Sequence, residues 1–221
     1  MKQMKKQKEE IKAVIFDIGG VLSLPHYYVQ KGRHEFSGIH ESIAHALGIT
    51  SDQWFDAIDT LYGKAIVGKV SRKKFIAEVS RRLSVSKQKL VSIITRSYHK
   101  GMMRNDQLFT LTQKLKKNRI IVGILSDQWH LSRESIFSKR DEALFDIVII
   151  SYEVKTRKPH PEMYTILMKK ITAKNKKIKP SEVVFIDDKM YNLEPAKKLG
   201  VKTILFRNNK QVMRELRKFI D

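Results

Sequence analysis

The sequence predicts an α/β fold, in which helices sandwich a Rossmann-like parallel sheet and a helical subdomain is inserted into the chain. Five short apolar runs recur along the 221 residues. Each run is continuously apolar rather than alternating, which is typical of strands buried on both faces. Helical patterns separate the later runs, as in an α/β protein. Residues 24–104 make the first connection much longer than the usual few residues plus one helix.

The five runs are the expected strands of the sheet. In chain order they are Ala13–Phe16, Ile120–Leu125, Ile147–Ile150, Val183–Ile186 and Thr203–Phe206. Between and after them, helix boundaries can be predicted from single residues. Pro161 suits the first turn of one helix, and Gly200 suits the position just past the end of another. The last helix has an apolar stripe of Val212, Leu216, Phe219 and Ile220.

The long first connection predicts a subdomain of its own. Three stretches within it have apolar residues on one helical face: Trp54, Ile58, Leu61, Tyr62 and Ala65; Phe75, Ile76, Val79 and Leu83; and Leu90, Ile93 and Ile94. Ser71 and Ser86 stand where the second and third of these helices need N-caps. We therefore expect an α/β core domain of residues 1–23 and 105–221 and an inserted helical subdomain of residues 24–104.

Composition limits the function classes. The 44 Lys and Arg residues exceed the 23 Asp and Glu residues by 21, and such an excess attracts phosphates, nucleic acids or anionic membrane surfaces. The chain has no cysteine, which excludes disulfides, a thiol nucleophile and a thiolate metal site. Its apolar runs are far shorter than the roughly 20 residues that span a bilayer, and no signal-peptide hydrophobic region follows the cationic N-terminus. The default expectation is a soluble cytoplasmic protein.

Polar residues follow the predicted strands at the edge where open α/β sheets bind ligands. Asp17 ends the first strand, Ser126 and Asp127 the second, and Asp187 and Asp188 the fourth, while Lys158 lies after the third. Each residue taken alone also suits a helix cap or a solvated position. Adjacent carboxylates, however, repel unless a cation neutralises them. Carboxylates, a hydroxyl and an ammonium converging at one edge predict a phosphate-handling site.

Four motifs resemble those of the haloacid dehalogenase (HAD) superfamily of phosphohydrolases, in the same order and at the same strand ends. They are VIFDIGGVL at residues 14–22, ILSD at 124–127, RKPHPEMY at 157–164 and FIDDKMYNLEPAKKLG at 185–200. The insertion of residues 24–104 corresponds to the family's small helical cap. The sequence is most similar to members related to the phosphatase domain of epoxide hydrolases and to sugar-phosphate phosphatases.

The resemblance implies a Mg²⁺-dependent hydrolase of a small phosphomonoester. Asp17 would attack phosphorus and form an aspartyl-phosphate, which water then hydrolyses. Mg²⁺ would be held by Asp17, the Gly19 carbonyl and Asp188, with Asp187 ligating or orienting. The substrate would contact Ser126, Asp127, Lys158 and Gly20, and Ser126 and Lys158 would also stabilise the transferring phosphoryl group. Asn192 either orients the acidic pair or caps a helix.

Two departures from the family pattern bear on activity. Gly19 stands where family phosphatases usually have a second Asp that serves as general acid and base, a role that contributes roughly 10²–10⁴-fold. Catalysis would then be slow unless another group substitutes. Asp127 stands where an amide is common. An ionised carboxylate there would repel phosphate, whereas a protonated one would donate a hydrogen bond. A solvent-facing or salt-bridged Asp127 is the other possibility.

Other functions remain open on the sequence alone. The run Lys169–Lys179 contains six lysines and no acid, which suits either a solvated face or a nucleic-acid contact. A catalytically weak or inactive phosphate-binding or nucleic-acid-associated member is therefore the alternative, although the favoured partner is a small phosphorylated metabolite. A metal-free dehalogenase would have no use for the pair Asp187 and Asp188. The segment Ser23–Tyr28 suits a substrate entrance or a domain junction. His34, His40 and His45, with Glu35 and Glu41, fit no strong metal motif.

Overall fold

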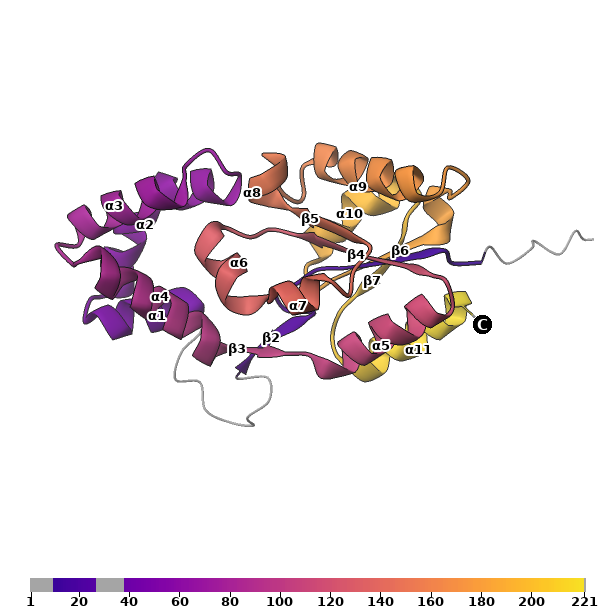
Figure 1. Ribbon diagram of the computed structural model, residues 1–221, viewed down its shortest axis with the longest axis horizontal. Coiled ribbons are helices and arrows are strands. Elements are labelled where there is room, and N and C mark those ends of the chain that lie inside the picture. The colour runs from indigo at the N-terminus through magenta and orange to yellow at the C-terminus, as the bar shows by residue number, and fades with distance from the viewer. Residues whose placement is uncertain (1–9, 27–37, 221) are drawn as a thin grey trace, which may run out of the picture.

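The computed structural model describes residues 10–26 and 38–220, and its centre is a five-stranded parallel sheet (Figure 1). The strand order is β5-β4-β1-β6-β7. The strands are β1 (Ala13–Phe16), β4 (Ile121–Ser126), β5 (Ile147–Ile150), β6 (Val183–Asp187) and β7 (Lys202–Leu205). The five predicted strands are thus confirmed, with ends that differ by one residue in β4, β6 and β7.

Helices cover both faces of the sheet, as the continuous apolarity of the strands predicts. On one face lie α5 (Asp106–Lys117) and α11 (Asn209–Ile220), and on the other α9 (Pro161–Lys174) and α10 (Met190–Lys198) (Figure 1). Alternate residues of β1 point to opposite faces of the sheet. Val14 and Phe16 pack into the core under α5 and α11, whereas Ala13 and Ile15 pack into the core under α9 and α10.

Single residues set the helix boundaries as expected. Pro161 is the first residue of α9, where its missing N–H costs no hydrogen bond. Gly200 follows α10 with φ +85°, a left-handed conformation that favours glycine. Along α11, Val212 and Leu216 are buried, and Phe219 and Ile220 pack against the same core.

The inserted segment forms a helical unit around a second apolar core, to which Trp129 and Leu131 from outside the insertion also contribute. It contains α1 (Ile39–Leu47), α2 (Ser51–Ile66), α3 (Arg72–Arg82) and α4 (Lys87–Gly101). The Ser71 hydroxyl accepts from Lys74 N, and the Ser86 hydroxyl accepts from Lys89 N, so both predicted N-caps are confirmed. Apolar side chains from all four helices meet in this core, including those of Ile43, Trp54, Phe75, Leu90 and Ile94.

Several short elements were not predicted. Strands β2 (Ser23–Pro25) and β3 (Met102–Arg104) pair antiparallel where the chain leaves the core domain and where it returns. Three short helices, α6 (His130–Ile136), α7 (Lys139–Glu142) and α8 (Ser151–Val154), and a one-turn 3₁₀ helix, η2 (Pro180–Glu182), complete the described elements. None of the described helices has the length and apolar character that crossing a membrane requires.

Candidate active site

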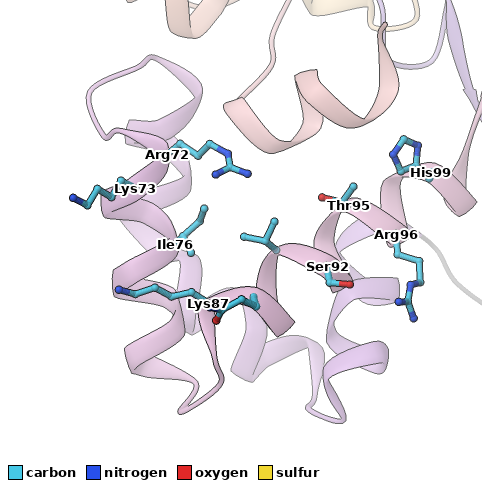
Figure 2. A pocket seen from close by; sticks show the side chains of 10 residues that line it. Arg72, Lys73, Ile76, Lys87, Ser92, Thr95, Arg96 and His99 are labelled. Atoms are coloured by element: carbon cyan, nitrogen blue, oxygen red, sulfur yellow. The ribbon is translucent and has the colours of Figure 1, made fainter.

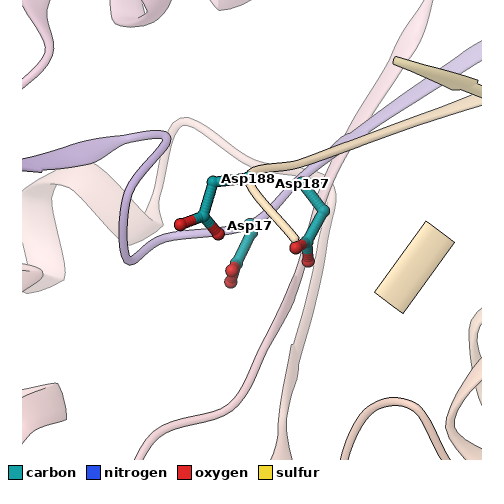
Figure 3. Close-up of side chains that lie close together, drawn as sticks. All are labelled: Asp17, Asp187 and Asp188. Atoms are coloured by element: carbon teal, nitrogen blue, oxygen red, sulfur yellow. The ribbon is translucent and has the colours of Figure 1, made fainter. Parts of the chain in front are cut away.

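The carboxyl ends of β1 and β6 bring three aspartates together (Figure 3). Asp17 directly follows β1, Asp187 ends β6, and Asp188 follows it. One carboxylate oxygen from each lies within 4.8 Å of the others. The strand ends therefore converge as predicted. They do so at β1, where the strand order changes direction: β4 and β5 lie on one side of β1, and β6 and β7 lie on the other.

A buried ammonium faces two of these carboxylates. Lys158 Nζ lies 2.6 Å from Asp187 Oδ2 and 3.0 Å from Asp17 Oδ2. The Lys158 side chain is 1% exposed, so it can stay charged only because the carboxylates compensate its lost hydration. Burial by itself lowers the pKa of Lys158, but the attraction of Asp17 and Asp187 outweighs burial and raises that pKa above its ordinary value.

The Asp187 carboxylate is fully engaged by the protein. Its Oδ2 accepts from Lys158 Nζ, while its Oδ1 accepts from Lys189 N and from Asn192 Nδ2, both at 2.9 Å. Asn192 thus holds Asp187, one member of the acidic pair, which favours the first of the two roles that the sequence leaves open. Because both Asp187 oxygens already have donors, this carboxylate suits a positioning role better than a direct ligand role.

The Asp188 carboxylate has the opposite character. Its Oδ1 is buried and has no hydrogen-bond partner among the described residues. A buried carboxylate oxygen without a partner is costly unless a cation or a water compensates it. Gly20 makes room for this carboxylate. Its φ is +80°, and a Cβ there would collide with the Asp188 side chain.

Asp17 lies in a strongly perturbed environment. Burial raises its pKa, the Lys158 ammonium lowers it and the Asp187 charge raises it, to a result of about 7. The Asp17 Oδ1 atom accepts from Ile18 N at 2.7 Å, which fixes the carboxylate at the strand end. A carboxylate whose pKa is shifted by desolvation and neighbouring charges is a candidate functional group when it lies in a cleft.

Two predicted residues follow β4. Ser126 is fully buried, and its hydroxyl lies 3.3 Å from Gln128 Nε2. A hydrogen bond from Ser126 also lowers the pKa of Asp17. Asp127 is half-buried, and its Oδ1 accepts from Lys158 N at 3.0 Å. Burial raises the pKa of Asp127, although the Lys158 charge opposes the shift. The structure therefore places Asp127 at the site rather than out in solvent.

A hollow of about 530 Å³ opens onto these groups, and both parts of the chain line it. The insertion contributes Tyr62, Ile66 and Met102, and Pro25 of the predicted entrance segment also lines it. Of the predicted residues, the lining includes Asp17, Gly19, Gly20, Asp127, Lys158, Asp188 and Asn192. Nothing lies within 4 Å of a Cβ built on Gly19, so the second acid of the family pattern is replaced by open space.

The lining also includes residues that we did not predict. Arg157, Lys189 and Tyr191 lie within the quoted motifs and Gln128 directly follows one, and this position is the signal that could have identified them. Tyr62 was predicted only as a core residue, because a buried aromatic on a helical face is typical of packing. Its position in the hollow depends on how the insertion folds back over the sheet.

The remaining sequence candidates lie elsewhere. His40 Nδ1 accepts from Trp54 Nε1 at 3.0 Å, so its role is in packing, and no metal-type cluster other than the three aspartates is found among the described residues. Trp54 is buried, as its place on the apolar helical face predicts, and Trp129 is buried as well. Tyr27, Tyr28, His34 and Glu35 fall outside the described residues.

Comparisons with known proteins agree with this geometry. A family model for haloacid dehalogenase-like hydrolases matches residues 11–200. Bifunctional epoxide hydrolase 2 of Mus musculus is 31% identical over 175 residues, which cover 77% of this chain and 28% of that protein. This chain thus spans less than a third of the length of that relative. D-ribitol-5-phosphate phosphatase of Bacteroides thetaiotaomicron is 21% identical over 224 residues, which cover 93% of this chain and 97% of that protein.

The fold is also that of a solved structure. A HAD family enzyme from Bacteroides thetaiotaomicron, crystallised with magnesium and inorganic phosphate, has a TM-score of 0.68 to this chain. The match has 21% identity and covers 89% of this chain and 94% of that one. Since the family model spans most of the sequence and the strand-end motifs occupy their expected places, this chain belongs to the haloacid dehalogenase-like hydrolases.

Proposed function

We propose that this protein is a Mg²⁺-dependent phosphatase that hydrolyses a small phosphomonoester through an aspartyl-phosphate on Asp17. The observation that carries the proposal is the meeting of Asp17 and Asp188 with the buried Lys158 ammonium in one hollow. Paired carboxylates suit a hard cation, and an ammonium opposite them suits the charge of a phosphoryl group. The similarity to D-ribitol-5-phosphate phosphatase supports the same reaction class.

The donor set fits Mg²⁺. Asp188 offers a buried oxygen without a partner, and Asp17 offers a second carboxylate within the same cluster. The Gly19 carbonyl is the third proposed ligand from the protein. Asp187 is not a proposed direct ligand; it accepts a hydrogen bond from Lys158 and so positions the ammonium. When bound, Mg²⁺ supplies positive charge that offsets the repulsion among these carboxylates and the phosphoryl oxygens.

Asp17 acts as the nucleophile in the proposed reaction. Its carboxylate oxygen forms a bond to phosphorus as the ester P–O bond breaks, and the leaving oxygen takes a proton from solvent water to become an alcohol. Water then attacks phosphorus, the bond to Asp17 breaks, and inorganic phosphate and the free carboxylate result. Lys158 and Ser126 stabilise the charge on the transferring phosphoryl oxygens.

Asp127 can add a hydrogen bond to the phosphoryl group, but it does not replace the proton donor missing at Gly19. Burial raises the pKa of Asp127, and a protonated carboxyl there would donate to a phosphoryl oxygen where an ionised one would repel it. One oxygen of Asp127 accepts from Lys158 N, and the residue lines the hollow. Turnover is expected to be slow with poor leaving groups, because no carboxylate stands at position 19 to protonate them.

The substrate is expected to be small. The hollow of about 530 Å³ lies in the middle of the range for small-molecule sites, roughly 300–1,000 Å³. Residues 24–104 act as the cap subdomain that shapes it, since Tyr62, Ile66 and Met102 line the hollow together with Asp17 and Asp188. Arg157 and Lys189 add two cationic groups at the rim, which favour a phosphorylated metabolite.

Hydrolysis of p-nitrophenyl phosphate tests the proposal. We expect Mg²⁺-dependent release of p-nitrophenol by the parent, abolished by EDTA and lowered to background in Asp17→Asn. The matched control is Asp56→Asn, which makes the same change at an exposed position on α2 and should leave the rate unchanged. Absence of turnover by the folded parent across a broad panel of phosphomonoesters would contradict the proposal and favour a phosphate-binding member without turnover.

A further inference from the structure

A groove on the cap, remote from the aspartates, has no part in the proposed reaction. It runs between α3 and α4 and has a volume of about 1050 Å³ (Figure 2). Its lining comes from these two helices alone: Arg72, Lys73, Ile76, Lys87, Gln88, Val91, Ser92, Thr95, Arg96 and His99. The volume lies at the upper end of the roughly 300–1,000 Å³ of small-molecule pockets, so a larger occupant fits it better.

The charge of the groove has one sign. None of the lining residues is acidic, and four of them are Lys or Arg. Among the described residues, the side chains of Lys73, Lys87 and Arg96 pair with no carboxylate. On α3, Arg81 and Arg82 both pair with Glu78, the one acid of that helix. Lys74 of α3 lies outside the groove lining. The groove lining itself therefore presents cations without any acidic residue.

The fourth cation is only loosely engaged. Arg72 Nε lies 3.3 Å from Glu134 Oε1 of α6, and both side chains are more than two-fifths exposed. An exposed pair of this kind contributes roughly 0–1 kcal/mol. An incoming carboxylate can therefore replace Glu134 at little cost. Figure 2 shows Arg72 and Lys87 at opposite ends of the space between the helices.

The floor of the groove is apolar. Ile76 faces the space between the helices (Figure 2), and Val91 and Thr95 add half-buried aliphatic groups from α4. A cationic rim around an apolar floor matches an amphipathic segment that has both carboxylates and aliphatic side chains. It matches a nucleic acid poorly, because the lining contains no Phe, Tyr or Trp on which bases could stack.

A second copy of this chain is also a poor occupant. Each copy has a net charge of +21, so two copies repel each other at long range. The lining residues of α4 run from Lys87 to His99, and at about 1.5 Å per residue this side of the groove is roughly 18 Å long, enough for about three turns of a docked helix. We infer that the α3/α4 groove is a docking site for an acidic amphipathic helix of another protein.

Fluorescence anisotropy with the full-length chain tests this inference. The probe is a labelled 15-residue peptide with leucines at positions i, i+4, i+7 and i+11 and glutamates elsewhere on the helix. A scrambled peptide of the same composition and a single-stranded oligonucleotide of the same charge serve as competing probes. We expect the amphipathic peptide to bind at least about tenfold more tightly than either, since only it satisfies both rim and floor.

Paired charge reversals locate the site. Lys87→Glu/Arg96→Glu should weaken peptide binding by about tenfold or more, whereas Lys169→Glu/Lys170→Glu on α9, with the same change in net charge, should weaken it by no more than about twofold. Val91→Gln should weaken binding through the floor without any change of charge. Circular dichroism confirms folding, and unchanged p-nitrophenyl phosphate hydrolysis by the variants separates this result from the proposed function.

Three results would each overturn the inference. The first is that the oligonucleotide or the scrambled peptide binds the parent as tightly as the amphipathic peptide does. The second is that the α9 variant loses as much affinity as the groove variant, and the third is that the folded groove variant keeps parental affinity for the peptide.

Discussion

Replacing Lys158 by Met removes the one ammonium that lies between two buried carboxylates. At an effective dielectric constant of about 20, Nζ–O distances of 2.6 and 3.0 Å correspond to attractions of about 6 and 5.5 kcal/mol. Desolvation of the three groups offsets most of this gain. Breaking a buried pair by removing one partner costs roughly 3–5 kcal/mol, because the remaining charge stays buried without compensation. We expect a loss of stability of that size at pH 8 without Mg²⁺.

The loss should depend on pH and on metal. The folded pKa of Asp17 is raised from 3.8 to about 7, so ionising this group opposes folding, and the parent loses stability as pH rises from about 4 through about 7. Without Lys158, which lowers that pKa, the fall should continue to a higher pH and so become larger in total. The difference between variant and parent should therefore be smaller at pH 5 than at pH 8, and Mg²⁺ should reduce it at pH 8.

Urea unfolding of parent and variant, at both pH values and with or without Mg²⁺, measures these differences. Lys116→Met is the matched control, because Lys116 Nζ lies 3.0 Å from Asp146 Oδ1 but both side chains are partly exposed. This control should lose no more than about 1 kcal/mol. A loss below about 1 kcal/mol for Lys158→Met at pH 8 without Mg²⁺ would refute the reasoning that the ammonium holds the carboxylates together.

Three further substitutions probe the site. Gly20→Ala should cost at least about 1 kcal/mol more unfolding free energy in urea than Gly200→Ala, since both positions have positive φ but only the first Cβ collides with the Asp188 carboxylate; equal losses would show that the collision relaxes freely. Gly19→Asp should raise kcat for alkyl phosphates by up to about 10²–10⁴-fold and raise it less for p-nitrophenyl phosphate; a folded variant that is no faster on alkyl phosphates would count against position 19 as the missing acid. Asp127→Asn should keep its kcat/KM as pH rises, whereas the parent should decline once the raised pKa of Asp127 is passed, and parallel pH profiles would remove Asp127 from the substrate site.

The sheet was predictable because its signals are local. Continuous apolar runs such as Val183–Ile186 identify strands buried on both faces, and Pro161 and Gly200 set helix boundaries through their backbone preferences alone. The ribbon of β2 and β3 was not predictable, because three-residue strands have no period to detect and their pairing depends on segments 77 or more residues apart. Helix α1 was not predictable either, because it is short and the Gly38 at its N-cap offers no capping side chain.

The site was predictable where topology fixes it and not where tertiary packing does. Parallel strands bring their carboxyl ends to one edge, so Asp17 and the pair Asp187 and Asp188 could be placed together from the strand pattern. Which of the two neighbouring aspartates has hydrogen-bond donors was not predictable. Asp187 accepts from donors that the folded chain brings to it, whereas Asp188 Oδ1 has none among the described residues. Tyr62 reaches the hollow because the insertion packs over the sheet, which no local pattern encodes.

Trapping the covalent intermediate tests the central claim most directly. The parent would be mixed with p-nitrophenyl phosphate and Mg²⁺, quenched in acid within one turnover, digested with trypsin and analysed by mass spectrometry. The tryptic peptide of residues 13–31 contains a single acidic side chain, Asp17, so a phosphoryl group on it that hydroxylamine removes must be an acyl phosphate at that residue. We predict that this modified peptide accumulates and then decays as substrate is exhausted. Turnover with the peptide unmodified at every time point, or with a phosphoryl group that resists hydroxylamine, would contradict Asp17 as the nucleophile.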